Sequence, residues 1–167
     1  TFGFLGRLAA DKGVATLLDA FARADLPDVT LVVAGRGDLE SRVLAAPGVE
    51  YAGWVSADEK EVLLDRIDCL VVPSEWRDPA PLVTNEARAR GIPVIGAAIG
   101  GIPELIAPEC EPLLFAPGDT DGLVDRLRAY AASPGRFRSP PTAAPLDWQG
   151  HLAGLLDAYS DALEASR

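Results

Sequence analysis

The sequence predicts an α/β domain with a mainly parallel sheet and helices on both of its faces. Short apolar segments rich in β-branched residues, such as 29–34 and 67–72, alternate with segments whose apolar residues recur at helical spacing. These strand segments are apolar on both faces, as in a parallel sheet that helices cover on each side. With 167 residues, the chain is long enough for one such domain and too short for two. The predicted fold is therefore Rossmann-like.

The composition excludes several classes of function. A net charge of −10 and a pI near 4.5 argue against nucleic acid or anionic membrane as the main partner, since phosphate backbones need clustered Lys and Arg. No apolar run approaches the about 20 residues of a transmembrane helix. Cys69 and Cys110 fit a reduced, cytoplasmic compartment better than a disulfide framework. The single His151 has no partner at metal-ligand spacing, so we expect no metal site.

The first predicted strand covers residues 2–5, and a helix follows from about Lys12-Gly13. Because the chain opens without Met and already in this strand, we expect an excised fragment of a longer protein. Arg7 and Lys12 share the loop after the strand, where ligands of parallel sheets bind. The two cations can face a diphosphate there, or they can be solvated loop charges.

A second predicted strand covers 29–34 and is followed by Gly35-Arg36-Gly37. The glycines permit either a tight turn into a helix or a close approach of the backbone to a ligand. A dinucleotide-binding fingerprint would need a third small residue at position 40, where this chain has Glu40. A nicotinamide or flavin site is therefore disfavoured.

The third predicted strand covers 49–54, and the next helix runs from the N-cap Ser56 to Arg66, with Glu59 at the capping-box position. Trp54, at the end of the strand, can either pack against the protein or stack on a nucleobase.

The strand at 67–72 leads into the stretch 73–104, on which most of the functional interpretation depends. Pro79 and Pro81 suit the first turn of a helix, which we expect to continue over 84–90 until Gly91 ends it. Asp78 is then predicted at the mouth of this helix and Glu86 about two turns inside. The N-terminus of such a helix presents free N–H groups that suit a phosphate. From the residues alone, Asp78 can equally be an N-cap, and Glu86 a solvated partner of Arg90.

A buried strand at 92–95 follows, and Gly100-Gly101 then opens a loop. Residues 113–115 predict a short strand and 123–130 a helix. The segment 133–145 is rich in Pro, Ser, Ala and Arg and is predicted to be an extended connection. It leads to a terminal amphipathic helix marked by Leu152, Leu155, Leu156, Tyr159 and Leu163.

Taken together, these motifs resemble glycosyltransferase family 4, whose enzymes have the GT-B fold. The resemblance rests on "GRLAADKG", "AGRGD", "YAGWVS", "VVPSEW" and "GIPVIGAAIGGIPE", and on two carboxylates that flank seven residues, D-PAPLVTN-E. Asp78 stands where the family usually has Glu. The resemblance implies that residues 1–167 are the C-terminal donor-binding domain, one half of a GT-B fold, and that the acceptor-binding N-terminal domain is absent.

The resemblance also implies a site for a nucleotide-diphosphate sugar. Arg7 and Lys12 would hold the leaving diphosphate, Glu86 the ribose hydroxyls and Asp78 the hydroxyls of the transferred sugar. These cations and helix N–H groups would replace a metal ion, so neither a metal nor a cofactor is expected. The further implied binding residues are Gly6, Gly35, Gly37, Val55, Pro81, Leu82, Val83, Gly100 and Gly101.

By this resemblance the chain is part of a cytoplasmic transferase of carbohydrate biosynthesis, a retaining glycosyltransferase that transfers a hexosyl group to a glycan, lipid or small-molecule acceptor. The expected partners are a nucleotide sugar and the absent domain, not nucleic acid; peripheral membrane contact of the full enzyme stays open. We expect the isolated chain to bind donor without transferring sugar.

Two alternatives remain, a non-catalytic nucleotide-binding module and a sugar-nucleotide epimerase of the same fold. A phosphorylase is disfavoured, because it uses a pyridoxal phosphate lysine and the chain has only Lys12 and Lys60.

Overall fold

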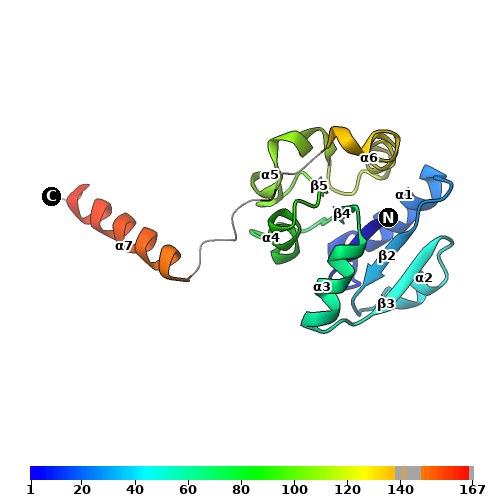
Figure 1. Cartoon of the computed structure of the whole chain (residues 1–167), viewed down its shortest axis with the longest axis horizontal. Helices are drawn as coiled ribbons and strands as arrows, with labels where there is room; N and C mark the ends of the chain where they lie inside the picture. Colours follow the sequence, from blue (N-terminus) through cyan, green and yellow to red (C-terminus); the bar gives the residue numbers. More distant parts are fainter. Residues whose placement is uncertain (138–140, 142–147, 166–167) are drawn as a thin grey trace.

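The computed structural model of the chain describes residues 1–137, 141 and 148–165. Its centre is one six-stranded sheet of order β3-β2-β1-β4-β5-β6, in which every neighbouring pair is parallel (Figure 1). This confirms the predicted Rossmann-like sheet. The strands are β1 (Phe2–Leu5), β2 (Leu31–Ala34), β3 (Val49–Gly53), β4 (Cys69–Val72), β5 (Val94–Ala97) and β6 (Leu114–Phe115).

Helices cover both faces of the sheet, as predicted. The long helices α1 and α6 pack against each other over one face, and α3 and α4 lie over the other (Figure 1). The α-helices are α1 (Val14–Ala24), α2 (Glu40–Leu44), α3 (Ala57–Arg66), α4 (Leu82–Ala89), α5 (Ile102–Leu105), α6 (Thr120–Ala132) and α7 (Trp148–Ala165). Short 3₁₀ helices are η1 (Ala10–Lys12), η2 (Pro108–Leu113) and η3 (Pro134–Arg136).

The core lies between the sheet and these helices. Strands β2 and β4 are buried at every position, which explains why their sequences are continuous apolar runs. Leu17 of α1 and Leu127 of α6 are fully buried, and each such side chain contributes about 1.5–3 kcal/mol of transfer free energy. This core fixes the positions at which the strands end, and so the edge of the sheet at which the loops meet.

The predicted N-terminus of α3 is confirmed in detail. The Ser56 hydroxyl accepts the Glu59 N–H, and the Glu59 carboxylate accepts the Ser56 N–H at 2.8 Å, which completes a capping box. The hydrogen bond from the Ser56 backbone, together with that from its hydroxyl, lowers the pKa of Glu59.

Helix α4 begins at Leu82, with Pro81 as its N-cap, so the position of Asp78 relative to the helix differs from the prediction. Asp78 and Ala80 each precede a proline, which disfavours helical backbone at both residues and delays the start of the helix. Asp78 therefore lies in the loop before α4 and does not cap it. Glu86 lies in the second turn rather than two turns inside.

The end of the chain is described in part. Within the predicted connection at 133–145, Pro134–Arg136 forms η3, while residues 138–140 and 142–145 lie outside the described residues. Helix α7 stands apart from the sheet in Figure 1, and its apolar residues from Leu152 to Leu163 are exposed. None of the described helices is long and apolar enough to cross a membrane.

Candidate functional site

The site lies where β1 and β4 end side by side in the middle of the sheet. From β1 the chain continues to α1 and β2 on one side, and from β4 to α4 and β5 on the other, so a crevice opens between the two connections. Two adjoining hollows occupy this edge, of about 370 and 440 Å³. Both are lined by Leu5, Gly6, Leu82 and Val83.

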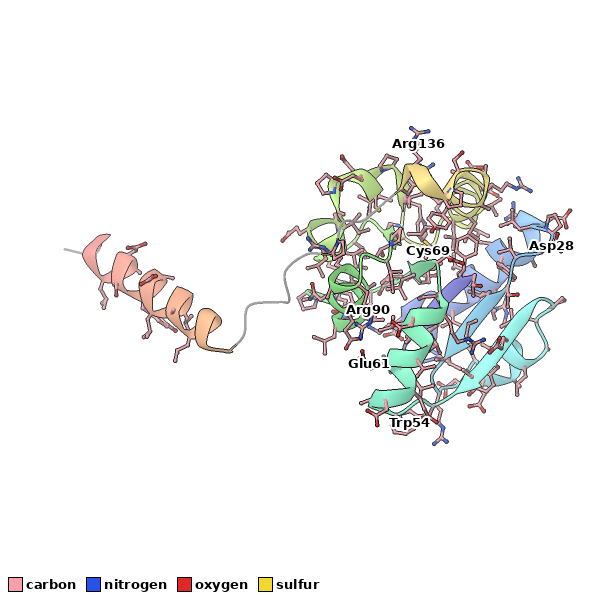
Figure 2. The ribbon with its side chains drawn as sticks, viewed as in Figure 1. Asp28, Trp54, Glu61, Cys69, Arg90 and Arg136 are labelled. Atoms are coloured by element: carbon pink, nitrogen blue, oxygen red, sulfur yellow. The ribbon has the colours of Figure 1, made fainter. Side chains whose placement is uncertain are left out.

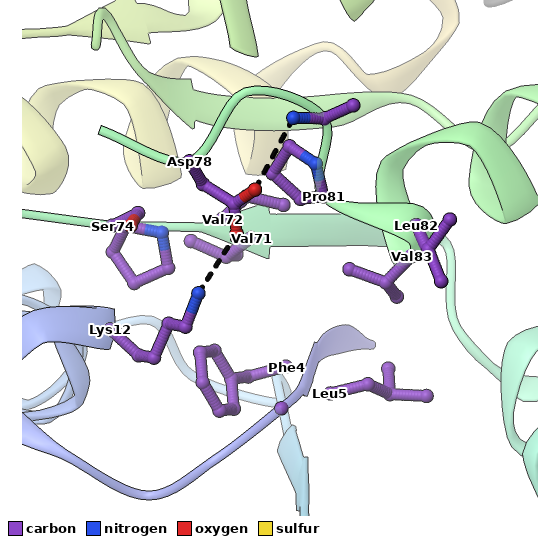
Figure 3. Close-up of a pocket in the computed structure, with 13 residues that line it drawn as sticks. Phe4, Leu5, Lys12, Val71, Val72, Ser74, Asp78, Pro81, Leu82 and Val83 are labelled. Atoms are coloured by element: carbon purple, nitrogen blue, oxygen red, sulfur yellow. Dashed lines mark hydrogen bonds and ion pairs between the residues drawn. The ribbon is translucent and has the colours of Figure 1, made fainter. Parts of the chain in front are cut away.

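The first hollow, called the Lys12 hollow, contains an ion pair between Lys12 and Asp78 (Figure 3). Lys12 Nζ lies 2.9 Å from Asp78 Oδ2, and Ala80 N–H donates to Asp78 Oδ1 at 3.2 Å. The Lys12 side chain is 29% exposed and that of Asp78 22% exposed, so both can still reach a ligand. Both residues were predicted for the site from the sequence, but their direct contact was not.

The loop that carries Asp78 is held in place by Gly101. The Gly101 N–H donates to the Asp78 carbonyl at 3.0 Å. A Cβ at Gly101 would lie 1.9 Å from the Pro79 carbonyl oxygen, a distance that no side chain tolerates. Gly100 packs on the same loop, against the Asp78 backbone. The glycine pair therefore lets the loop after β5 support the Asp78 loop from behind.

The second hollow, called the Lys60 hollow, contains the pair Lys60–Glu86, which joins α3 to α4. Lys60 Nζ lies 2.5 Å from Glu86 Oε1, and the two side chains are 31% and 29% exposed. Arg90 forms a second link, since its guanidinium pairs with Glu61 and also donates to the Glu86 carbonyl at 3.1 Å. Figure 2 shows Arg90 and Glu61 between the two helices. The alternative in which the Glu86 carboxylate pairs with Arg90 is thus not what the structure shows, because Arg90 contacts the Glu86 carbonyl and the carboxylate pairs with Lys60.

Gly35, directly after β2, packs against the backbone of Gly6, directly after β1, where both residues line the Lys60 hollow. Its φ is +139°, and a Cβ at this position would lie 1.8 Å from the Gly6 carbonyl oxygen, so only glycine fits here. The Tyr51 hydroxyl donates to the Gly35 carbonyl at 2.9 Å. Partial burial, and then the Glu40 carboxylate, raises the pKa of Tyr51, so the phenol is a neutral donor.

Two arginines add positive charge to the Lys60 hollow. Arg7 is 64% exposed and pairs with Asp11 at 2.7 Å, and Arg36 follows Gly35 in the turn after β2. With Lys60, they place three cations around one hollow of a chain whose net charge is −10. Two of these cations are already paired, Arg7 with Asp11 and Lys60 with Glu86, so an anion that enters the hollow competes with a carboxylate for each of them.

The N-terminus of α4 adds a further positive potential between the hollows. Its N-cap is Pro81, which provides no side-chain hydrogen bond to the first turn. Leu82 and Val83, the first two helical residues, line both hollows. Backbone N–H groups at such a helix start favour an anion such as phosphate.

All but three of the residues predicted for the site line one or both hollows. Gly37, Gly100 and Gly101 do not: Gly37 packs on the Leu8 backbone, and the other two lie behind Asp78. Lys60 and Arg36 were not predicted from the sequence. Lys60 lies near the start of α3, the helix that follows β3. Its place shortly after the carboxyl end of a strand is the feature of the sequence that could have identified it as a site residue. The predicted residues that line the hollows are Gly6, Arg7, Lys12, Gly35, Val55, Asp78, Pro81, Leu82, Val83 and Glu86.

The described residues include no group of three or more His, Cys, Asp or Glu side chains that could hold a metal ion. The charged side chains that line the two hollows are four cations and two carboxylates, and the Ser74 hydroxyl lines the first hollow.

The sequence is similar to those of known glycosyltransferases. A sequence model of the family described as "Glycosyl transferases group 1" matches residues 1–133. The chain is 30% identical to the glycogen synthase of Mycobacterium tuberculosis, in an alignment that covers 98% of this chain and 43% of that protein. It therefore spans less than half the length of this curated relative.

Solved structures share the fold. The Anabaena protein HepE in complex with UDP superposes with a TM-score of 0.71 at 25% identity, over 81% of this chain and 40% of that one. The C-terminal domain of a group 1 glycosyl transferase, LpcC, from Francisella tularensis superposes with a TM-score of 0.70 at 24% identity, over 82% of this chain and 78% of that one.

Proposed function

We propose that this chain, which belongs to the group 1 glycosyltransferases, is the C-terminal, nucleotide-sugar-binding half of a GT-B glycosyltransferase of family 4. Its span of less than half of the M. tuberculosis glycogen synthase supports this, because a GT-B enzyme has two such halves. The likeness to a structure described as a C-terminal domain supports the C-terminal placement.

The observation that supports the proposal most directly is the arrangement of two lysine–carboxylate pairs. They lie in two adjoining hollows that share the N-terminus of α4, at the ends of β1 and β4. Cations and helix N–H groups bind a diphosphate, and carboxylates bind sugar hydroxyls. A nucleotide sugar presents both kinds of group in one molecule. The UDP found in HepE supports a nucleotide as the ligand.

Breaking the bond between a sugar and its diphosphate puts negative charge on the leaving group. In the proposed complex Lys12, Arg7 and the N–H groups of Leu82 and Val83 meet this charge, which is the main catalytic need of the reaction. They do so without a metal ion or cofactor. Because Lys12 is paired with Asp78 in the free chain, an arriving diphosphate competes with the Asp78 carboxylate for the ammonium.

The carboxylates bind the two sugars of the donor. Asp78, in the Lys12 hollow, accepts hydrogen bonds from the hydroxyls of the transferred hexose, and its release from Lys12 frees Oδ2 for this task. Glu86, in the Lys60 hollow, accepts hydrogen bonds from the ribose. The nucleobase then lies at Gly35 and Val55, with Trp54 and Arg36 at the side of the hollow.

In the complete enzyme, the hexosyl group passes with retention of configuration to a glycan, lipid or small-molecule acceptor held by the N-terminal half. The chain alone binds donor and transfers no sugar. We also predict a cytoplasmic location for such an enzyme. The two free, buried cysteines are consistent with a reducing compartment.

A thermal-shift titration of the chain against UDP, GDP, ADP and CMP tests the proposal. A ligand at 100 times its dissociation constant stabilises the fold by about 2.7 kcal/mol. We expect one nucleoside diphosphate to raise the melting temperature, and the matched variant Glu86→Gln to lose much of the shift. Arg23→Gln, which removes a surface pair with Asp121 outside both hollows, serves as the control. A chain that no diphosphate stabilises would contradict donor binding.

A further inference from the structure

The chain has only two lysines among its 15 basic residues, and both pair with a carboxylate of the candidate site. Lys12 pairs with Asp78 and Lys60 with Glu86. The proposed function gives Lys12 a role on the diphosphate. It gives Lys60 none, although Lys60 lines the same hollow as Glu86.

The Lys60–Glu86 pair leaves hydrogen-bonding capacity on both partners. The contact at 2.5 Å uses Glu86 Oε1, and within the described part of the chain Glu86 Oε2 has no hydrogen-bond partner. A lysine ammonium has three donors, and this contact uses one of them. Both side chains remain about a third exposed within the hollow. The pair thus offers one acceptor and one donor next to each other.

We propose that Lys60 and Glu86 together bind a cis-diol. Glu86 Oε2 accepts a hydrogen bond from one hydroxyl group, and Lys60 Nζ donates to the oxygen of the neighbouring one. The contact with Lys60 also positions the carboxylate toward the hollow. This inference rests on the proposed function, in which the diol is the 2′,3′-diol of the donor ribose.

A lysine suits this task better than an arginine. A guanidinium tends to bind both oxygens of a carboxylate in a fork, which would leave Glu86 with no oxygen for the ligand. An ammonium is a compact charge that binds one oxygen and leaves the other. In a chain otherwise rich in arginine, the lysine at this position therefore fits ligand recognition.

A purely structural role for Lys60 explains less. Partly exposed ion pairs contribute little to stability. The spacing of α3 and α4 is already held by Arg90, which contacts Glu61, Asp65 and the Glu86 carbonyl. Removal of the Lys60 ammonium should therefore leave the fold and the position of α4 intact.

The test is a calorimetric titration of the chain with UDP, GDP and ADP and with their 2′-deoxy and 3′-deoxy forms. For the diphosphate that binds, we expect the parent to prefer the ribonucleotide by about tenfold or more, the effect of losing one hydrogen bond to a charged group. Lys60→Met should weaken ribonucleotide binding about tenfold and reduce the preference over one of the two deoxy forms, the one that lacks the hydroxyl bound by Lys60, to within about threefold. Lys60→Arg keeps the charge but should not restore the preference.

Arg66→Met is the matched control, because Arg66 lies on the same helix and pairs with Glu50 outside both hollows. It should keep the affinity and the preference of the parent. If Lys60→Met weakens ribo- and deoxyribonucleotides equally, or not at all, Lys60 does not bind the diol. A parent-like preference in Lys60→Arg would refute the argument for a single free oxygen. A parent chain that binds no diphosphate overturns the proposed function itself.

Discussion

Lys12 and Asp78 lie 66 residues apart in the sequence, and their side chains meet at 2.9 Å at the carboxyl edge of the sheet. One follows β1 and the other follows β4, the two parallel strands at which the order of strands along the sheet reverses. The fold therefore places a cation and an acceptor of hydroxyl groups in one hollow of about 370 Å³. The first two predictions concern this pair.

Replacing Lys12 with Met should weaken the binding of a nucleoside diphosphate by about 10- to 100-fold, since one charge-assisted contact is lost. The corresponding nucleoside should bind with little change, because it lacks the phosphates. Calorimetric titration with both ligands measures the difference. Equal losses for nucleoside and diphosphate would show that Lys12 does not face the phosphates.

Replacing Asp78 with Asn should leave the affinity for a nucleoside diphosphate unchanged or higher, because Lys12 is released from its competitor. The gain in affinity that the attached hexose provides should fall, since a carboxylate acceptor is lost. The measurement is the ratio of the dissociation constants of UDP-glucose and UDP, or of the matching GDP or ADP pair. An unchanged ratio, with equal donor turnover in the complete enzyme, would remove Asp78 from the site.

Replacing Gly101 with Ala should destabilise the chain by about 1–3 kcal/mol, because the new methyl group meets the Pro79 carbonyl oxygen. Denaturant unfolding measures the change in the free energy of unfolding. Gly135→Ala is the control, since a Cβ at Gly135 meets no atom within 4 Å. Equal stability of the two variants would show that the loop after β5 does not support the Asp78 loop.

The capping box of α3 predicts a pH dependence of stability. The pKa of Glu59 is lower in the folded chain than in the unfolded chain, so its contribution is present above the unfolded pKa and is lost as the pH falls through the folded pKa. Glu59→Gln should therefore be less stable than the parent at pH 7, and the difference should shrink below about pH 4. Thermal unfolding at a series of pH values measures it; a constant difference would exclude the titration of Glu59 as its cause.

The fold was predictable because its signals are local. Buried strands such as β4 are apolar at every position, and the spacing of Ser56 and Glu59 identifies the start of α3. The edge of the sheet that carries the site follows from the parallel arrangement alone.

The contacts within the site were not predictable in this way. Lys60 reaches Glu86 across 26 residues, which depends on how α3 and α4 pack. The start of α4 at Leu82 depends on Pro79 and Pro81. Each proline ring clashes with the backbone of the residue before it and so disfavours helical geometry there, which delays the start of the helix. The glycines after β5 allow close packing against the backbone of the Asp78 loop. No pattern in the residues next to these glycines indicates that contact.

The central claim is that the ends of β1 and β4 form a nucleotide-sugar site. A titration of the ¹⁵N-labelled chain with UDP, GDP or ADP, followed by amide chemical shifts, tests it residue by residue. We expect the largest changes at Gly6, Gly35, Val55, Leu82 and Val83, which line the two hollows. Changes confined to the hollow at the opposite edge, around Phe2 and Tyr130, or no changes with any of the three nucleotides, would contradict the account.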